Sequence, residues 1–83
     1  MLLLSHNKMT DRLLEKLNLS PQEAKLYLAA LELSPATATI LAEKAGIERT
    51  ASYPHLKNLV KMGLLSVRPE KNKKLYIAEN PKK

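Results

Sequence analysis

The apolar residues of this chain repeat with a helical period up to Gly63 and with a shorter period after it. Gly46 and Gly63 are its only glycines, and each ends a helical pattern, where the left-handed backbone of a helix C-cap favours glycine. After Gly63, two runs rich in Val, Leu, Tyr and Ile, 64–69 and 74–78, flank a charged turn in which Asn72 is expected to be left-handed. The change of period predicts a helical body followed by a β-hairpin.

Capping signals and apolar spacing predict four helices before Gly63. The first, 10–18, is short, whereas the second, 20–33, begins with a capping box in which Ser20 is the N-cap and Glu23 the third helical residue. The second helix has two apolar stripes, Ala24, Tyr27, Leu28 and Leu31 in one and Leu26, Ala30 and Leu33 in the other. It is therefore expected to lie centrally, with neighbours on two sides.

A tight turn at Gly46 separates the third and fourth predicted helices. The third begins at Thr37 and carries a narrow apolar stripe formed by Ala38, Leu41, Ala42 and Ala45. Ile47 is expected to turn back into the core. The fourth runs from Arg49 to Met62, with an apolar face formed by Tyr53, Leu56, Leu59 and Val60. Two helices joined by such a turn and followed by a hairpin predict a mainly α fold of the winged helix-turn-helix type.

The length of 83 residues allows one small domain, placed here at 10–78 between a flexible leader, 1–9, and a polar tail, 79–83. Without cysteine the chain has no disulfide or thiolate zinc site, and without Phe or Trp its core is expected to consist of Leu, Ile and Ala. The apolar start, 1–4, is too short for a signal sequence or a membrane span, which predicts a cytoplasmic protein.

The net charge of +6 is distributed unevenly along the chain. Residues 1–48 hold five basic and six acidic side chains, whereas residues 49–83 hold nine basic and two acidic ones. Such an excess in one half indicates a polyanionic partner, either a nucleic acid or an anionic membrane surface. The alternative is a solvated basic face without a partner.

Three segments carry a resemblance to a known family: Leu19–Tyr27, Pro35–Ala38 and Gly46–Thr50. They resemble the DNA-binding domain of TrmB-type transcriptional regulators, over roughly residues 17–78. The segments Tyr53–Leu59 and Gly63–Leu65 are also similar to PadR-type winged helices. The resemblance implies sequence-specific binding of double-stranded DNA, and the cytoplasmic protein is therefore expected to be nucleoid-associated. The resemblance does not imply sugar sensing, because the ligand-binding domain of TrmB-type regulators has no counterpart here. A second departure from the family pattern is Ile40, which stands where such a helix often carries a polar residue.

The DNA-binding candidates come from the fourth helix, 49–62, and the basic wing, 65–78. With the apolar face turned inward, the residues closest to bases in the major groove are expected to be Thr50, Ala51 and Pro54. The side chains expected near phosphates are Arg49, Lys57, Asn58 and Lys61, with His55 at the margin of the same face. The wing is expected to contact the flanking backbone or minor groove through Arg68, Lys71, Lys73 and Lys74.

Several of these residues have a purely structural alternative. Thr50 could only cap its helix, Tyr53 fits the core with its hydroxyl bonded to the backbone, and His55 could be solvated. No grouping of acids, nucleophiles or metal ligands predicts an enzyme, a metal site or a cofactor. The main rival function is protein–protein interaction through Leu2–Leu4, Ile40 and the short first helix, and RNA binding is a weaker one. A homodimer contacting through residues 2–17 is a further expectation.

Overall fold

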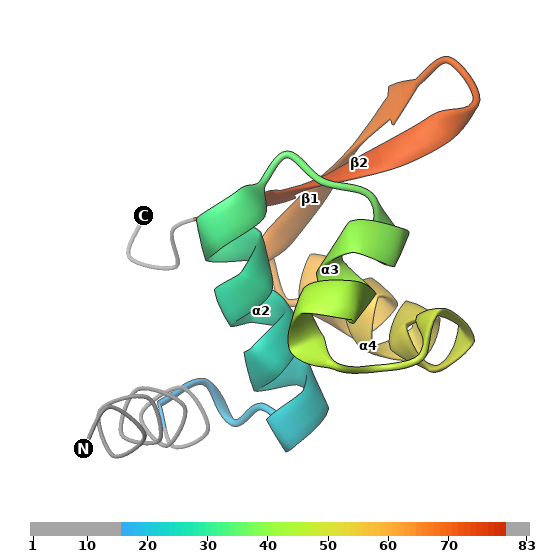
Figure 1. Cartoon of the computed structure of the whole chain (residues 1–83). Helices are drawn as coiled ribbons and strands as arrows, with labels where there is room; N and C mark the ends of the chain where they lie inside the picture. The colour runs from blue at the N-terminus through green and yellow to red at the C-terminus, as the bar shows by residue number, and fades with distance from the viewer. Residues whose placement is uncertain (1–15, 80–83) are drawn as a thin grey trace.

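The computed structural model describes residues 16–79 and shows three complete helices followed by an antiparallel hairpin (Figure 1). The elements are α2 (Pro21–Leu33), α3 (Ala38–Ala45), α4 (Arg49–Lys61), β1 (Leu65–Glu70) and β2 (Lys73–Ala78). The predicted winged helix-turn-helix is confirmed, and each predicted boundary within the described residues is correct to within one residue. The leader, most of the predicted helix 10–18 and the tail beyond Glu79 lie outside the described residues.

Helix α2 begins as the capping box predicts. The Glu23 backbone N–H donates to Ser20 Oγ at 3.2 Å, and the Ser20 N–H donates to Glu23 Oε1, also at 3.2 Å. The helix is central, since it packs against α3, α4 and β2. The two predicted stripes are only partly correct, because Leu31 and Leu33 are 54% and 38% exposed. Both lie at the last turn of α2, where no neighbouring element among residues 16–79 covers them.

The turn between α3 and α4 follows the sequence prediction closely. Thr37 caps α3, with its Oγ1 accepting from the Ile40 N–H at 3.4 Å. Gly46 ends the helix with a φ of 74°, in the left-handed region that glycine adopts without steric cost. The N–H of Ile47 donates to the Ala42 carbonyl at 2.9 Å, and the Ile47 side chain packs against the core.

The inward face of α4 differs from the predicted one. Ser52 is fully buried, whereas Tyr53, which we expected in the core, is 44% exposed. Burial of Ser52 is possible because its hydroxyl donates to the Arg49 carbonyl at 2.6 Å, and because a small side chain permits close packing. The inward face is formed by Ser52, Leu56 and Leu59. The prediction that Tyr53 is a core residue was therefore wrong.

The hairpin pairs β1 with β2 in register from Leu65 opposite Ala78 to Glu70 opposite Lys73. This register leaves Lys71 and Asn72 as a two-residue turn, and Lys71, with a φ of 52°, takes the left-handed position that we had assigned to Asn72. Near its base, Tyr76 exchanges two backbone hydrogen bonds with Ala36, of 2.7 and 3.1 Å. These bonds attach the hairpin to the segment that leads into α3.

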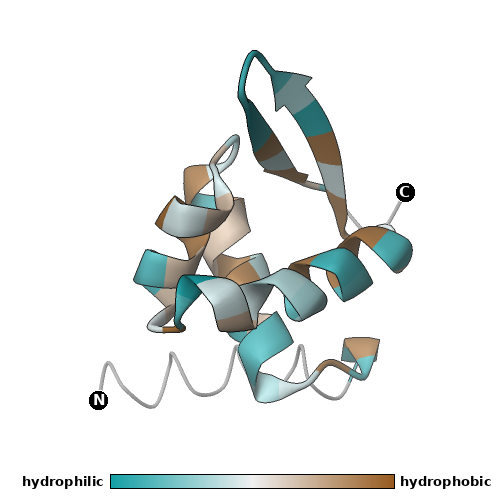
Figure 2. Cartoon of the chain, turned by 90° about the vertical axis from the view of Figure 1, so that its right-hand side faces the viewer, coloured by the Kyte–Doolittle hydropathy of each residue, from teal (hydrophilic) through white to brown (hydrophobic). Residues whose placement is uncertain are grey.

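The core lies between the three helices and the base of the hairpin. Its largest fully buried side chains are Leu26, Tyr27, Leu41, Leu56, Leu59 and Leu65. Tyr27 satisfies its hydroxyl by donating to the Glu79 carbonyl at 2.8 Å. Figure 2 shows hydrophobic residues where the helices meet, and a hydrophilic turn at the far end of the hairpin. Within residues 16–79, no helix combines the length and the apolar character that crossing a bilayer requires.

Candidate nucleic-acid interface

The outward face of α4 carries small, polar and basic side chains. Thr50, Ala51, Pro54, Lys57 and Lys61 are all exposed. The N-cap of α4 is Glu48, so the alternative that Thr50 serves only as a helix cap is wrong. Thr50 and Pro54 lie four residues apart and therefore share one face of the helix. Small, polar and basic side chains on one helix face are the chemistry required of a helix that enters a DNA major groove.

Pro54 changes the hydrogen bonding of this face. It lies inside α4 and has no backbone N–H, so the Thr50 carbonyl lacks the donor that an ordinary residue at position 54 would supply. The Thr50 residue itself is exposed at this position.

His55 and Asn58, which we expected at the DNA surface, both contact α2. Both approach one oxygen of Glu23: Asn58 Nδ2 donates to Oε2 at 3.1 Å, and His55 Nδ1 lies 3.3 Å from it. The other oxygen of Glu23 belongs to the capping box. The Glu23 carboxylate thus joins the start of α2 to the middle of α4. These partners are separated by 32 and 35 residues, so no local sequence pattern could have shown the contact.

The surroundings of Glu23 keep it ionised. Burial alone would raise its pKa, but the hydrogen bond from the Ser20 backbone and those from His55 and Asn58 outweigh burial, so the pKa is lowered from its ordinary value of 4.5. At neutral pH the ionised carboxylate therefore accepts the three hydrogen bonds from Ser20, His55 and Asn58.

The basic residues of the hairpin do not all face the same way. Lys71, Lys73 and Lys74 surround its tip and are exposed. Side chains alternate between the two faces of a strand, so Lys74 and Tyr76 share one face, whereas Arg68, paired with Leu75, lies on the other. The structure thus gathers three lysines at the tip and places Arg68 apart from Lys74.

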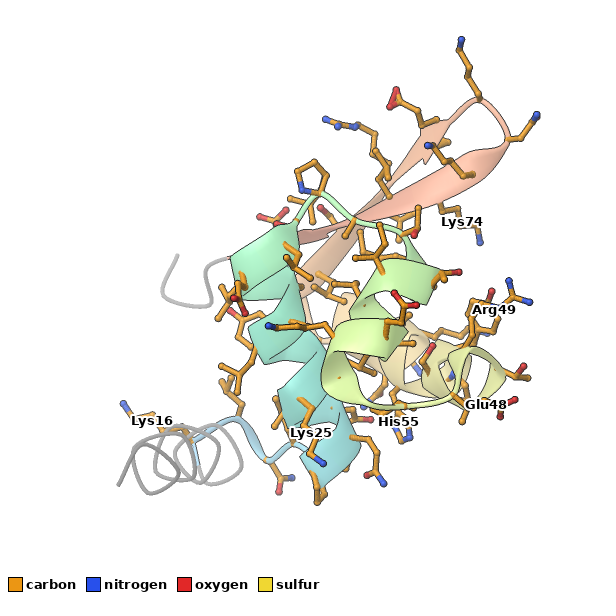
Figure 3. All side chains as sticks on the ribbon, in the orientation of Figure 1. Lys16, Lys25, Glu48, Arg49, His55 and Lys74 are labelled. Carbon is orange, nitrogen blue, oxygen red and sulfur yellow. The ribbon has the colours of Figure 1, made fainter. Side chains whose placement is uncertain are left out.

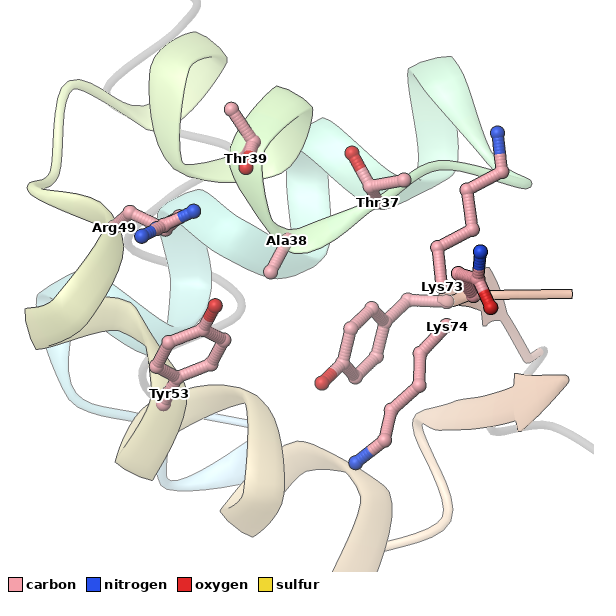
Figure 4. Close-up of a pocket in the computed structure, with 9 residues that line it drawn as sticks. Thr37, Ala38, Thr39, Arg49, Tyr53, Lys73 and Lys74 are labelled. Carbon is pink, nitrogen blue, oxygen red and sulfur yellow. The ribbon is translucent and has the colours of Figure 1, made fainter. Parts of the chain in front are cut away.

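A groove of about 500 Å³ lies between the start of α3, the first turns of α4 and the hairpin (Figure 4). It is lined by Thr37, Ala38, Thr39, Arg49, Tyr53, Asn72, Lys73, Lys74 and Tyr76. In Figure 3, Arg49 and Lys74 lie on the same side of the molecule. Sequence reasoning missed six of these lining residues as candidate site residues: Thr37, Ala38, Thr39, Tyr53, Asn72 and Tyr76. The predicted capping role of Thr37 was the one local signal pointing to this end of α3.

The sequence matches the family described as "Sugar-specific transcriptional regulator TrmB" over residues 14–82. A Bacillus subtilis (strain 168) relative, described as "Uncharacterized protein YrhO", is 41% identical over 51 residues, which are 61% of this chain and 18% of that protein. Among solved structures, TrmBL2, described as an archaeal chromatin protein with a novel mode of DNA binding, matches with a TM-score of 0.80 at 26% identity. The match covers 92% of this chain and 30% of TrmBL2.

Two further structures share the fold at lower identity. RV1404 from Mycobacterium tuberculosis has a TM-score of 0.76 at 16% identity, covering 94% of this chain and 55% of that one. The transcriptional regulator BldR from Sulfolobus Solfataricus has a TM-score of 0.67 at 21% identity, covering 94% of this chain and 57% of that one. Because the family match spans every helix and strand described above, the chain belongs to the TrmB family of transcriptional regulators.

Proposed function

We propose that this winged helix-turn-helix domain binds double-stranded DNA sequence-specifically, with α4 in the major groove and the hairpin on the flanking backbone or minor groove. The observation that carries the proposal is the outward face of α4, where Thr50, Ala51 and Pro54 are exposed beside basic side chains. A helix that packed against another protein segment would be expected to show leucines there. The description of TrmBL2 as a DNA-binding chromatin protein supports the same partner.

Base reading is assigned to the first two turns of α4. The Thr50 hydroxyl can bond to base edges, and Ala51 or Pro54 can pack against a thymine methyl group. The residues assigned to phosphates are Arg49, Lys57 and Lys61 from α4 and Arg68, Lys71, Lys73 and Lys74 from the hairpin. His55 and Asn58 are assigned to holding α4 against α2, since both contact Glu23.

A protein-interaction role is the second candidate, and exposed apolar side chains favour it. Leu31 and Ile40 are 54% and 45% exposed, on α2 and α3. Neither lines the groove or lies on α4, so such a partner would use a different surface from the proposed DNA interface. Homodimeric binding also belongs to the proposal, although the expected contact surface, 2–17, lies outside the described residues except for Lys16 and Leu17.

Selection from a random duplex library, followed by fluorescence anisotropy, tests the base-reading assignment. Thr50→Ala should change which sequences are preferred, because it removes a group that can contact bases. Lys61→Ala is the matched control on the same helix, and it should weaken binding to all duplexes to a similar extent. An unchanged preference after replacing Thr50, Ala51 and Pro54 together would contradict the assignment, and absence of duplex binding would favour the protein-interaction role.

A further inference from the structure

We propose that the groove between α3, α4 and the hairpin seats a single phosphodiester group of the bound DNA strand. This inference rests on the proposed function and adds a site that involves Thr39 and Tyr53, neither of which was among the candidates from sequence.

The charge of the groove favours an anion. Arg49 lies on the α4 side and Lys73 and Lys74 on the hairpin side, as Figure 4 shows, and none of the lining residues is acidic. Glu48, next to Arg49 in sequence, does not line the groove. Arg49 and Lys74 reach the groove from two elements, and Lys73 adds positive charge at its edge from the other face of β2, so the local concentration of an anion is raised.

The donors of the groove suit phosphate oxygens. The first backbone N–H groups of α3, on Ala38 and Thr39, have no carbonyl partner within the helix and point out of its N-terminal end. The Ile40 N–H is already bonded to Thr37 Oγ1, which leaves the N–H groups of Ala38 and Thr39, two residues that line the groove. The Thr39 side chain is exposed and also lines the groove, where its hydroxyl adds another donor.

Two tyrosines complete the lining. Tyr53 is 44% exposed and Tyr76 is 8% exposed, so the groove is bounded by one accessible phenol and one buried phenol. Burial raises the pKa of Tyr76, and nearby Tyr53 raises it further. The Tyr76 hydroxyl therefore keeps its proton at neutral pH and remains a donor.

The two walls of the groove are fixed relative to each other. Tyr76 and Ala36 exchange backbone hydrogen bonds of 2.7 and 3.1 Å immediately before α3 begins. The hairpin strand that carries Lys74 is therefore held next to the start of α3. A phosphate seated here would be met by donors already in position, and it would set the register of the strand between α4 and the hairpin.

NMR titration of the whole chain with a short DNA duplex tests the site directly. The amide signals of Ala38 and Thr39 should shift as the duplex saturates the protein, because these N–H groups would bond to the phosphate. Inorganic phosphate at the same ionic strength should shift the same signals weakly, and the duplex should displace it. If inorganic phosphate saturates these signals and the duplex does not compete, the site binds free phosphate and the proposal is overturned.

Variants separate the groove from the rest of the interface. Thr39→Val and Tyr53→Phe remove hydroxyls without changing charge, so each should weaken duplex binding by roughly tenfold while the salt dependence stays the same. Arg49→Gln should also reduce the slope of log K against log salt by about 0.9, whereas Lys25→Gln, on the exposed surface of α2 outside the groove, should change neither quantity. Unchanged amide spectra elsewhere check that each variant is folded.

The outcomes distinguish this proposal from the proposed function. Saturable duplex binding that shifts α4 amides but leaves Ala38 and Thr39 unmoved overturns the phosphate seat and leaves DNA binding intact. If both Thr39→Val and Tyr53→Phe bind the duplex with the parental affinity, the proposed phosphate site is also overturned. If no duplex binds at all, the proposed function itself fails.

Discussion

Replacing Glu23 with alanine should destabilise the domain far more than removal of an ordinary helix carboxylate. The Glu23 side chain is only 12% exposed and accepts from Ser20, while His55 and Asn58 contact its other oxygen. Loss of the capping box formed by Ser20 and Glu23 costs about 0.5–1 kcal/mol. Each contact with α4 adds about 0.5–1 kcal/mol, the lower part of the usual range, because distances of 3.1 and 3.3 Å are long. The expected loss is about 2 kcal/mol.

Thermal and urea denaturation at neutral pH measure this loss, and Glu32 provides a control on the same helix. A loss of about 2 kcal/mol corresponds to a fall in Tm of roughly 8–16 °C for a domain of this size. Glu32 pairs with Lys44 at 3.6 Å, but the two side chains are 61% and 50% exposed, so Glu32→Ala should cost less than about 0.5 kcal/mol. Equal stability of the two variants would refute the role given to Glu23.

The pH dependence of the same contact has a definite sign. Because the folded-state pKa of Glu23 lies below 4.5, its carboxylate stabilises the fold above pH 4.5, and this contribution is lost as pH falls through the lower, folded-state value. Glu23→Gln should therefore be less stable than the parent at pH 7, and the difference should shrink in acid. A difference that is constant from neutral pH to below the folded-state pKa would show that charge plays no part.

Three further predictions concern the hairpin and α4. Replacing Lys71, Lys73 and Lys74 together with alanine should reduce the slope of log K against log salt for duplex binding by about two to three, with sequence preference kept; the parental slope would show that the hairpin tip does not touch DNA. Ser52→Leu should destabilise the domain by about 1–3 kcal/mol through overpacking of a fully buried site. Tyr53→Ala should lower the free energy of unfolding, measured by urea denaturation, less than Ser52→Leu does. The reverse order would indicate that Tyr53 is a core residue.

The sequence was sufficient to predict features that depend on residues close together in the chain. The capping box of Ser20 and Glu23, the cap at Thr37 and the left-handed Gly46 are set by side chains a few positions apart, and all three were predicted correctly. The hairpin was also predicted, because the change of period after Gly63 is local. The left-handed residue was assigned to Asn72 on intrinsic preference, but the strand register gives that position to Lys71.

The candidate site was less predictable because it depends on packing between distant segments. Hydropathy placed Tyr53 on the inward face, but the close approach of α4 to the core instead selects Ser52, a smaller residue whose hydroxyl is hydrogen-bonded to the Arg49 carbonyl. The link from Glu23 to His55 and Asn58 joins two helices that have no pattern in common. The groove likewise requires α3, α4 and the hairpin to be assembled before its lining residues can be identified.

The pair of backbone hydrogen bonds between Ala36 and Tyr76 has a consequence for how a duplex would fit this protein. A hairpin joined to the body only through its own base could swing to follow DNA of any shape. Here the span from α4 to the hairpin is set by the protein, so a duplex bound as proposed would have to adjust its own groove width or curvature to match it. The energy of that adjustment depends on base sequence, so base pairs that no side chain touches would also contribute to which sites are preferred.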